Sequence, residues 1–333
     1  MNDLLIGVLS ALMATNQPAA LSNLVQQKTG LSLSIPDPHD PVEREYQSIL
    51  EQDDQALEDV DRLILESRQS ADSLSDVQKA LLNTRIQSRL DQVNNAYQSF
   101  INLHPRHTRA LMAYGSFLSD QGKEVEAAKQ WKKAAECDPD NPVAWNNLAN
   151  FHAHNGPATQ AFDYYAKAVE LAPTESLYYH NFGTTVYMFR QAAMTHFNTN
   201  QQGVFDKAMA LYQKAVEYDP HNFKLATDVA QTYYGIKPTQ TGDPLQDRQA
   251  AQALADRALQ AWQYAMKLAR DDVERQGVLL HYARIQINAD RFEEARRHLN
   301  AITNSIYDVT KDRLLKKLES RESPTPPPSP QVP

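Results

Sequence analysis

A period of 34 residues in the middle of the chain constrains the fold more than any other feature of the sequence. Pro105, Pro139 and Pro173 lie 34 residues apart, and Pro220 follows 47 residues later. The same interval separates small and aromatic residues: Gly115, Ala149 and Gly183; Ala127 and Ala161; Trp131 and Tyr165; Ala134 and Ala168. Small residues let two helices approach closely, aromatic residues fill the remaining groove, and proline ends each unit. The period therefore predicts an array of helical units.

Two adjacent units carry one motif in register. Residues 144–149 read Ala-Trp-Asn-Asn-Leu-Ala and are followed by Ala161, Tyr165, Ala168 and Pro173. The preceding unit has the equivalent residues Leu111, Tyr114, Gly115, Ala127, Trp131, Ala134 and Pro139. This pattern resembles the tetratricopeptide repeat (TPR) family, whose unit is a pair of antiparallel helices. The resemblance covers about residues 74–305 and implies an all-α fold, an α-solenoid of stacked antiparallel helix pairs (a TPR superhelix).

The chain is predicted to divide into an acidic helical segment, a repeat array, a capping helix and a tail. The N-terminal segment spans 1–73, and the array spans 74–305 with units at about 74–107, 108–141, 142–175, 176–222, 223–272 and 273–305. The unit 176–222 exceeds the period, and its insertion is placed around Phe189–Gly203. Residues 306–321 are predicted to form an amphipathic capping helix, and the proline-rich residues 322–333 a disordered tail.

The negative charge of the chain lies at its N-terminal end. The formal net charge is −8, whereas residues 1–73 alone hold 4 basic and 13 acidic residues. The array is therefore close to neutral, and no basic stripe interleaved with aromatic residues occurs, so nucleic-acid binding is not expected. Glycine-rich phosphate-binding motifs and catalytic signatures are absent from the sequence, and the lone Cys137 excludes an internal disulfide.

An apolar run at residues 4–14 leaves the location of the protein open. It is much shorter than the roughly 20 residues that a membrane-spanning helix needs. It matches the core of a signal peptide in length, but Asp3 stands where a basic residue is expected. We favour a cytoplasmic protein; the alternative is a secreted or periplasmic one, or a protein associated with a membrane through this segment.

Candidate binding residues follow from the resemblance, because the first helix of each pair lines the concave groove in which the family holds peptides. Asn147 and Asn181 occupy equivalent positions 34 residues apart, and Asp228 aligns with them in the next unit. The pattern is similar to the asparagine ladder in the repeat region of O-linked N-acetylglucosamine transferases, but Ala113 interrupts it in the preceding unit. Asn150 follows Asn147 by about one turn and shares its face. The alternative is structural, since such amides also cap or bridge neighbouring helices.

Two histidines, His154 and His180, are predicted to point into the same groove. They suggest a metal-binding or pH-sensing site, but a polar groove wall is the simpler interpretation, because no third ligand is placed with them by spacing. The chaperone-tail clamp of some relatives needs Lys and Arg at groove positions, and here only Arg109 and Lys224 lie near such positions. No catalytic residue, metal or cofactor is expected.

The sequence thus favours a non-enzymatic scaffold for protein–protein interactions that binds a peptide segment of a partner protein in the groove. The first alternative is a membrane-associated or secreted assembly factor tethered by the N-terminal apolar segment. The second is an accessory subunit of an enzyme. The identity of the partner and the oligomeric state are not encoded in any feature of the sequence.

Overall fold

The computed structural model describes residues 37, 39–69, 75–238 and 240–322, and these residues form 14 α-helices and no strand. The all-α expectation is confirmed for this part of the chain. The apolar run 4–14 and the tail from residue 323 lie outside the described residues. The chain divides into two compact units, Met1–Asp140 and Asn141–Pro333.

The first unit contains two long helices followed by a helix pair: α3 Pro41–Gln69, α4 Asp76–Leu103, α5 Thr108–Asp120 and α6 Glu124–Cys137. A repeat unit at 74–107 is expected to contain a pair of helices. Residues 76–103 instead form one continuous helix. No glycine or proline interrupts this stretch, and Ser75 starts it with a capping box in which Gln78 is the partner. The helix that pairs with α4 is α3.

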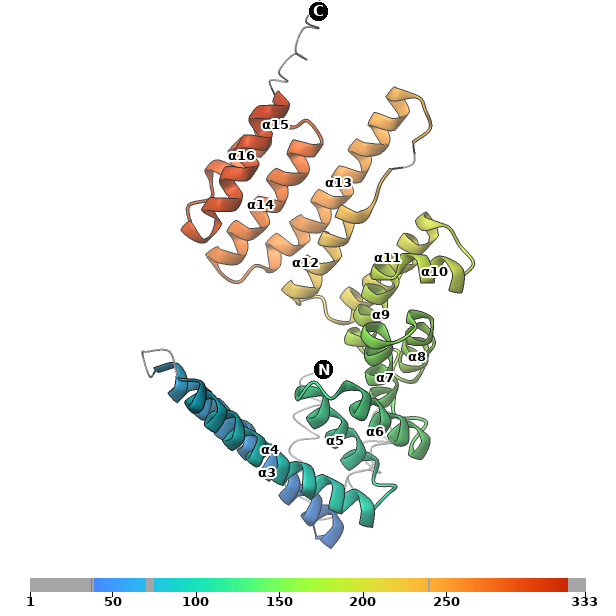
Figure 1. The fold of residues 1–333 in the computed structure, drawn as a ribbon. Coiled ribbons are helices and arrows are strands. Elements are labelled where there is room, and N and C mark those ends of the chain that lie inside the picture. Colours follow the sequence, from blue (N-terminus) through green and yellow to red (C-terminus); the bar gives the residue numbers. More distant parts are fainter. Residues whose placement is uncertain (1–36, 38, 70–74, 239, 323–333) are drawn as a thin grey trace, which may run out of the picture. The chain divides into compact units, whose positions relative to one another are not determined.

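Side-chain contacts fix α3 and α4 as an antiparallel pair, which Figure 1 shows as two long adjacent helices. Tyr97 donates from its hydroxyl to Asp53 over 2.8 Å, and Arg89 donates from Nε to Asp59 over 2.9 Å. Residue numbers therefore rise along α3 as they fall along α4. Tyr97 and Phe100 are fully buried, so the contact is anchored at the end of α4 that leads to α5.

The close approach predicted from small and aromatic residues occurs between α5 and α6. A Cβ atom on Gly115 would lie 2.3 Å from Nε1 of Trp131, so no larger residue fits there without movement of the indole. Trp131, Tyr165, Tyr212 and Trp262 are all at most 5% exposed. The prediction that aromatic residues fill the space between the helices is confirmed for Trp131 and Tyr165, and Tyr212 and Trp262 are buried in the same way.

The second unit continues the alternation of helices. Its elements are α7 Pro142–Asn155, α8 Ala158–Leu171, α9 Ser176–Met188, α10 Arg190–His196, α11 Gln201–Tyr218, α12 Phe223–Thr232, the 3₁₀ turn η1 Tyr233–Gly235, α13 Pro244–Leu268, α14 Asp272–Asn288, α15 Phe292–Asn300, the 3₁₀ turn η2 Ser305–Tyr307 and α16 Asp308–Glu322. Helices α7 and α8, α9 and α11, α12 and α13, and α14 and α15 form the packed pairs. The short α10 occupies the predicted insertion (Figure 1).

Local sequence explains where these helices begin. Asn141, Asn200, Asn222 and Asp243 each accept a hydrogen bond from a backbone N–H in the first turn of the following helix. Such caps satisfy donors that a helix leaves unpaired. At the other end, α16 buries Leu314 and Leu318 in a cluster with residues of α14 and α15. It therefore covers the last pair, and it starts at Asp308 rather than at residue 306.

Candidate functional site

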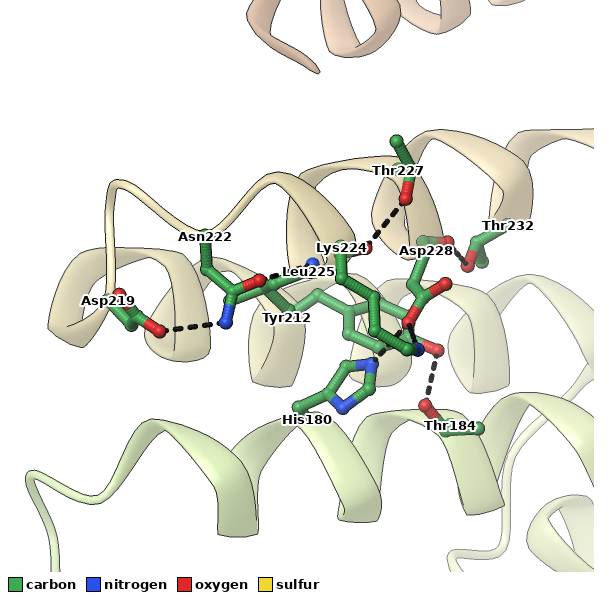
Figure 2. A network of polar contacts seen from close by, with 10 residues as sticks. All are labelled: His180, Thr184, Tyr212, Asp219, Asn222, Lys224, Leu225, Thr227, Asp228 and Thr232. Atoms are coloured by element: carbon green, nitrogen blue, oxygen red, sulfur yellow. Dashed lines mark hydrogen bonds and ion pairs between the residues drawn. The ribbon is translucent and has the colours of Figure 1, made fainter. Parts of the chain in front are cut away.

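An ion-paired network joins α9 and α12, the first helices of two consecutive pairs. Nε2 of His180 on α9 lies 3.1 Å from Oδ2 of Asp228 on α12, and Nζ of Lys224 donates to the same oxygen over 2.8 Å. Figure 2 shows His180 and Lys224 converging on the Asp228 carboxylate from the two helices. Lys224 precedes Asp228 by one helical turn, the spacing at which opposite charges pair on one helix face.

The Asp228 carboxylate is held in its ionised form. Burial by itself raises the pKa of this group, but the hydrogen bonds from His180 and Lys224 outweigh burial and lower the pKa below its ordinary value of 3.8. The carboxylate therefore stays negative at neutral pH. The backbone carbonyl of Asp228 accepts from Thr232, and Thr184 is hydrogen-bonded to the hydroxyl of the buried Tyr212 beneath the network (Figure 2).

A groove of about 350 Å³ adjoins this network. We call it the α9–α12 groove; its lining residues are Glu175, Ser176, Leu177, His180, Asn181, Asp219, Asn222, Lys224 and Leu225. The Asn222 side chain is engaged within the protein: its Oδ1 accepts from the N–H of Leu225, and its Nδ2 donates to Asp219 (Figure 2). The groove thus presents amides and charges of both signs beside apolar leucines.

A relay of three amides leads from α9 to α7. Nδ2 of Asn181 donates to Oδ1 of Asn146 over 3.2 Å, and Nδ2 of Asn146 donates to Oδ1 of Asn147 over 3.3 Å. Asn146 is only 4% exposed, and both the oxygen and the nitrogen of its side-chain amide are hydrogen-bonded inside the protein. Within the part of the chain that the structure describes, Nδ2 of Asn147 and Oδ1 of Asn181 are left without a partner at the two ends of the relay.

Asn150 is fixed by the core beneath it. The Tyr165 hydroxyl donates to Oδ1 of Asn150 over 2.6 Å. Burial raises the pKa of Tyr165 to about 12, so this hydroxyl keeps its proton at neutral pH. Oδ1 of Asn150 is therefore engaged by the core.

The structure brings together most but not all of the predicted residues. His180 and Asp228 are in contact, and Asn181 lines the groove. Asn147 does not line it but is hydrogen-bonded to Asn146, which in turn is hydrogen-bonded to Asn181. His154 differs, because it lies in the last turn of α7 with an exposed side chain. Among the described residues, no group of three or more His, Cys, Asp or Glu side chains is arranged to hold a metal ion.

Sequence reasoning missed Asn146 as a site residue and the role of Lys224 in the network. The spacing of Lys224 and Asp228 is a usable signal for their ion pair. The two basic candidates for a clamp are both engaged: Arg109 pairs with Glu43 over 2.7 Å and stacks over Tyr46, and Lys224 pairs with Asp228. A clamp of unpaired cations is therefore not present at these two positions.

In the described residues, no helix combines the length and the apolar character needed to cross a membrane. The apolar run 4–14, on which a membrane tether would depend, lies outside these residues.

Comparisons with known proteins find tetratricopeptide repeats in this chain. A model of the TPR repeats of TmcB matches residues 41–140, and a tetratricopeptide repeat model matches residues 131–161. The first match begins before residue 74, where the array is predicted to start, and so includes α3. The C-terminal part of a TPR repeat-containing protein from Cytophaga hutchinsonii has a similar fold, with a TM-score of 0.53, 13% identity, and coverage of 83% of this chain and 99% of that one.

Among curated proteins, the chain is similar to parts of larger ones. Hsp70-Hsp90 organizing protein 1 of Glycine max is 25% identical over 194 residues, which are 55% of this chain and 32% of that protein. Protein O-mannosyl-transferase TMTC3 of Homo sapiens is 29% identical over 92 residues, 27% of this chain and 10% of that protein. The chain thus spans about a third of the length of the first of these relatives and a tenth of the second.

Proposed function

Since this chain is a tetratricopeptide repeat protein, we propose that it is a non-enzymatic scaffold that binds a peptide segment of a partner protein in the α9–α12 groove and along the adjoining amides of α7. One observation carries the proposal: the amide relay leaves an acceptor at Asn181, which lines the 350 Å³ groove, and a donor at Asn147, at the other end of the relay on α7. A donor and an acceptor together match what a peptide bond offers.

The relay gives the two outer amides a fixed orientation. Because the buried Asn146 uses its own donor on Asn147 and its own acceptor on Asn181, the orientation of each outer amide is set before a ligand arrives. A peptide carbonyl would then accept from Nδ2 of Asn147, and a peptide N–H would donate to Oδ1 of Asn181. Preorganised groups of this kind lose little conformational freedom on binding.

Charge at the start of the two helices adds a preference for basic residues. Glu175 and Asp219 both line the end of the groove where α9 and α12 begin, whereas Lys224 and His180 already share the Asp228 carboxylate. A Lys or Arg of the partner segment would pair with the two carboxylates. Leu177 and Leu225 lie beside them and would contact its aliphatic stem.

The double variant Asn147→Ala with Asn181→Ala tests the proposal. The partner is first captured from native lysate and its binding segment is mapped with overlapping synthetic peptides. We expect the double variant to weaken binding of the mapped peptide about tenfold, because each lost hydrogen bond to a peptide is worth about 0.5–1.5 kcal/mol. The double variant leaves the buried Asn146 amide without both of its partners and should therefore lose some stability. Binding is measured at a temperature at which circular dichroism shows unchanged helical content.

A matched control removes two exposed side-chain amides elsewhere in the second compact unit, Asn141–Pro333. Asn155 and Asn300 end α7 and α15 with exposed side chains, so Asn155→Ala with Asn300→Ala should bind the peptide like the wild type. If the groove variant captures the peptide with unchanged affinity, the amides play no part in binding and the groove is not the site.

A further inference from the structure

A second pocket lies at the other end of α9 from the groove. It has a volume of about 260 Å³ and is lined by Tyr187, Arg190, Gln201, Gln202, Val204, Phe205, Gly235, Ile236, Lys237 and Pro238. Its walls come from the end of α9, the start of the inserted helix α10, the first turn of α11 and the segment that follows α12. The insertion in this repeat therefore supplies part of the wall, through Arg190, Gln201 and Gln202.

Two cations, Arg190 and Lys237, line this pocket, and Tyr187 holds the first of them in place. The guanidinium of Arg190 lies 4.9 Å from the centre of the Tyr187 ring and donates to the Tyr187 carbonyl over 3.3 Å. These two contacts fix the position of the charge and leave further N–H groups of the guanidinium unused. Lys237 is exposed at the rim and has no ion-pair partner among the described residues.

None of the described residues that line the pocket carries a carboxylate. Asp206, which does not line the pocket, accepts from the side chain of the lining residue Gln202 over 2.8 Å. The backbone N–H groups of Gln201 and Gln202 belong to the first turn of the 18-residue helix α11, where no intrahelical acceptor exists for them. The positive side chains and these N–H groups make the pocket favourable for a single negative charge.

The inner part of the pocket is apolar. Val204 and Phe205 are 1% and 9% exposed, and Ile236 and Pro238 complete this part of the lining. A Cβ atom on Gly235 would lie 1.8 Å from the Tyr187 hydroxyl, so a larger residue there would displace the Tyr187 side chain from the pocket wall. With Tyr187 in its observed position, the close approach of the two segments depends on the absence of a side chain at Gly235.

We infer that this pocket is a binding site for a carboxylate carried on a bulky apolar group. Arg190 and Lys237 receive the carboxylate, and Val204, Phe205 and Ile236 contact the apolar group. The site is separate from the α9–α12 groove, which is lined by the first half of α9.

The test uses two small probes that differ only in charge, N-acetyl-L-phenylalanine and its uncharged amide, titrated into the full chain and followed by NMR of the backbone amides. We expect the acid to shift the signals of Gln202, Gly235 and Ile236 with millimolar affinity, and the amide to bind at least about fivefold more weakly, as the loss of a charge-assisted contact implies. Raising the salt concentration should weaken binding of the acid, because the rim is open to solvent.

Variants separate the role of the cations from a change in fold. Lys237→Ala and Arg190→Gln should each weaken binding of the acid about three- to tenfold. Lys267→Ala, the same change at an exposed position near the end of α13, should not affect it. The variant Asn147→Ala with Asn181→Ala should also bind the acid normally, so failure of the groove proposal and failure of this one are distinguishable.

Three outcomes overturn the inference: equal binding of the acid and the amide, unchanged binding of the acid by Lys237→Ala and Arg190→Gln, or absence of shifts at Gln202 and Gly235 when the acid is added. The first would mean an apolar pocket with no selectivity for charge. The other two would mean that the acid binds elsewhere or not at all.

Discussion

Asp228 shows how much of the candidate site depends on a single side chain. Its carboxylate is hydrogen-bonded to His180 of the neighbouring repeat and to Lys224 of its own helix. Its backbone carbonyl accepts a hydrogen bond from the Thr232 hydroxyl. The Asp228 side chain is 27% exposed, so water screens the pairs only in part. The residue therefore links two neighbouring repeats directly beside the groove.

Replacing Asp228 by Asn should destabilise the protein at neutral pH by about 1 kcal/mol, because a partly exposed ion pair contributes about that much. The pKa of Asp228 is lowered in the folded state, so its contribution is fully present above the ordinary value of 3.8 and is lost as the pH falls through the lowered value. Thermal unfolding followed by circular dichroism should show a gap between wild type and variant at pH 7 that narrows as the pH falls below 3.8. A gap of equal size above and below pH 3.8 would mean that the carboxylate charge is not what stabilises the contact.

At the scale of the helices, the 34-residue period predicted where the helix pairs lie, but it did not predict which side chains are in contact. The spacing of Gly115 and Trp131 identified a real close approach, because it reflects packing that recurs from unit to unit. Asn146 was missed, because a repeat pattern aligns equivalent positions and does not give the direction of a side chain. The single helix α4 was missed because its apolar residues follow the same phase as a helix pair, and only the absence of a breaker in 76–103 distinguishes the two.

Three elements meet at His281 on α14. Its ring stacks on Trp262 of α13 at 3.8 Å, and its Nδ1 lies 2.8 Å from the hydroxyl of Tyr234 in η1. Burial, with a smaller contribution from the nearby Arg284, lowers the pKa of His281 from 6.5 to about 4. The imidazole is therefore neutral in the folded protein at neutral pH, and so it stacks without carrying a buried charge.

The lowered pKa of His281 predicts a loss of stability in mild acid. Between its unfolded value of 6.5 and its folded value of about 4, the unfolded chain binds a proton that the folded protein does not. Stability should therefore be complete above pH 6.5 and decline toward pH 4, by on the order of 3 kcal/mol in total. His281→Phe keeps a ring on Trp262 and removes the titration, so its thermal midpoint should depend less on pH in this range. An equal decline in wild type and variant would assign the acid sensitivity to other groups.

At the largest scale, the order of helix packing within the second unit is that of an array, in which each pair packs mainly on its neighbours in sequence. Three separate hydrophobic clusters fill this unit, around Tyr165 and Tyr212, around Trp262, and around Leu299 and Leu318. In such an array, stability is close to a sum of the contributions of the repeats and of the contacts between neighbours. A local change should therefore remain local.

Leu318→Ala tests this consequence at the last helix. Leu318 is fully buried among residues of α14 and α15, so its truncation should cost about 2–5 kcal/mol where the surroundings cannot collapse. Hydrogen exchange should become faster in α14, α15 and α16, whereas α7 and α8, which contribute to the cluster around Tyr165, should keep their protection. The exposed Leu245→Ala in α13 is the matched control, because it removes the same atoms without opening a cavity. Uniform loss of protection from α7 to α16 would instead show that the second unit unfolds as one cooperative body, and that the additive description of the array does not hold for it.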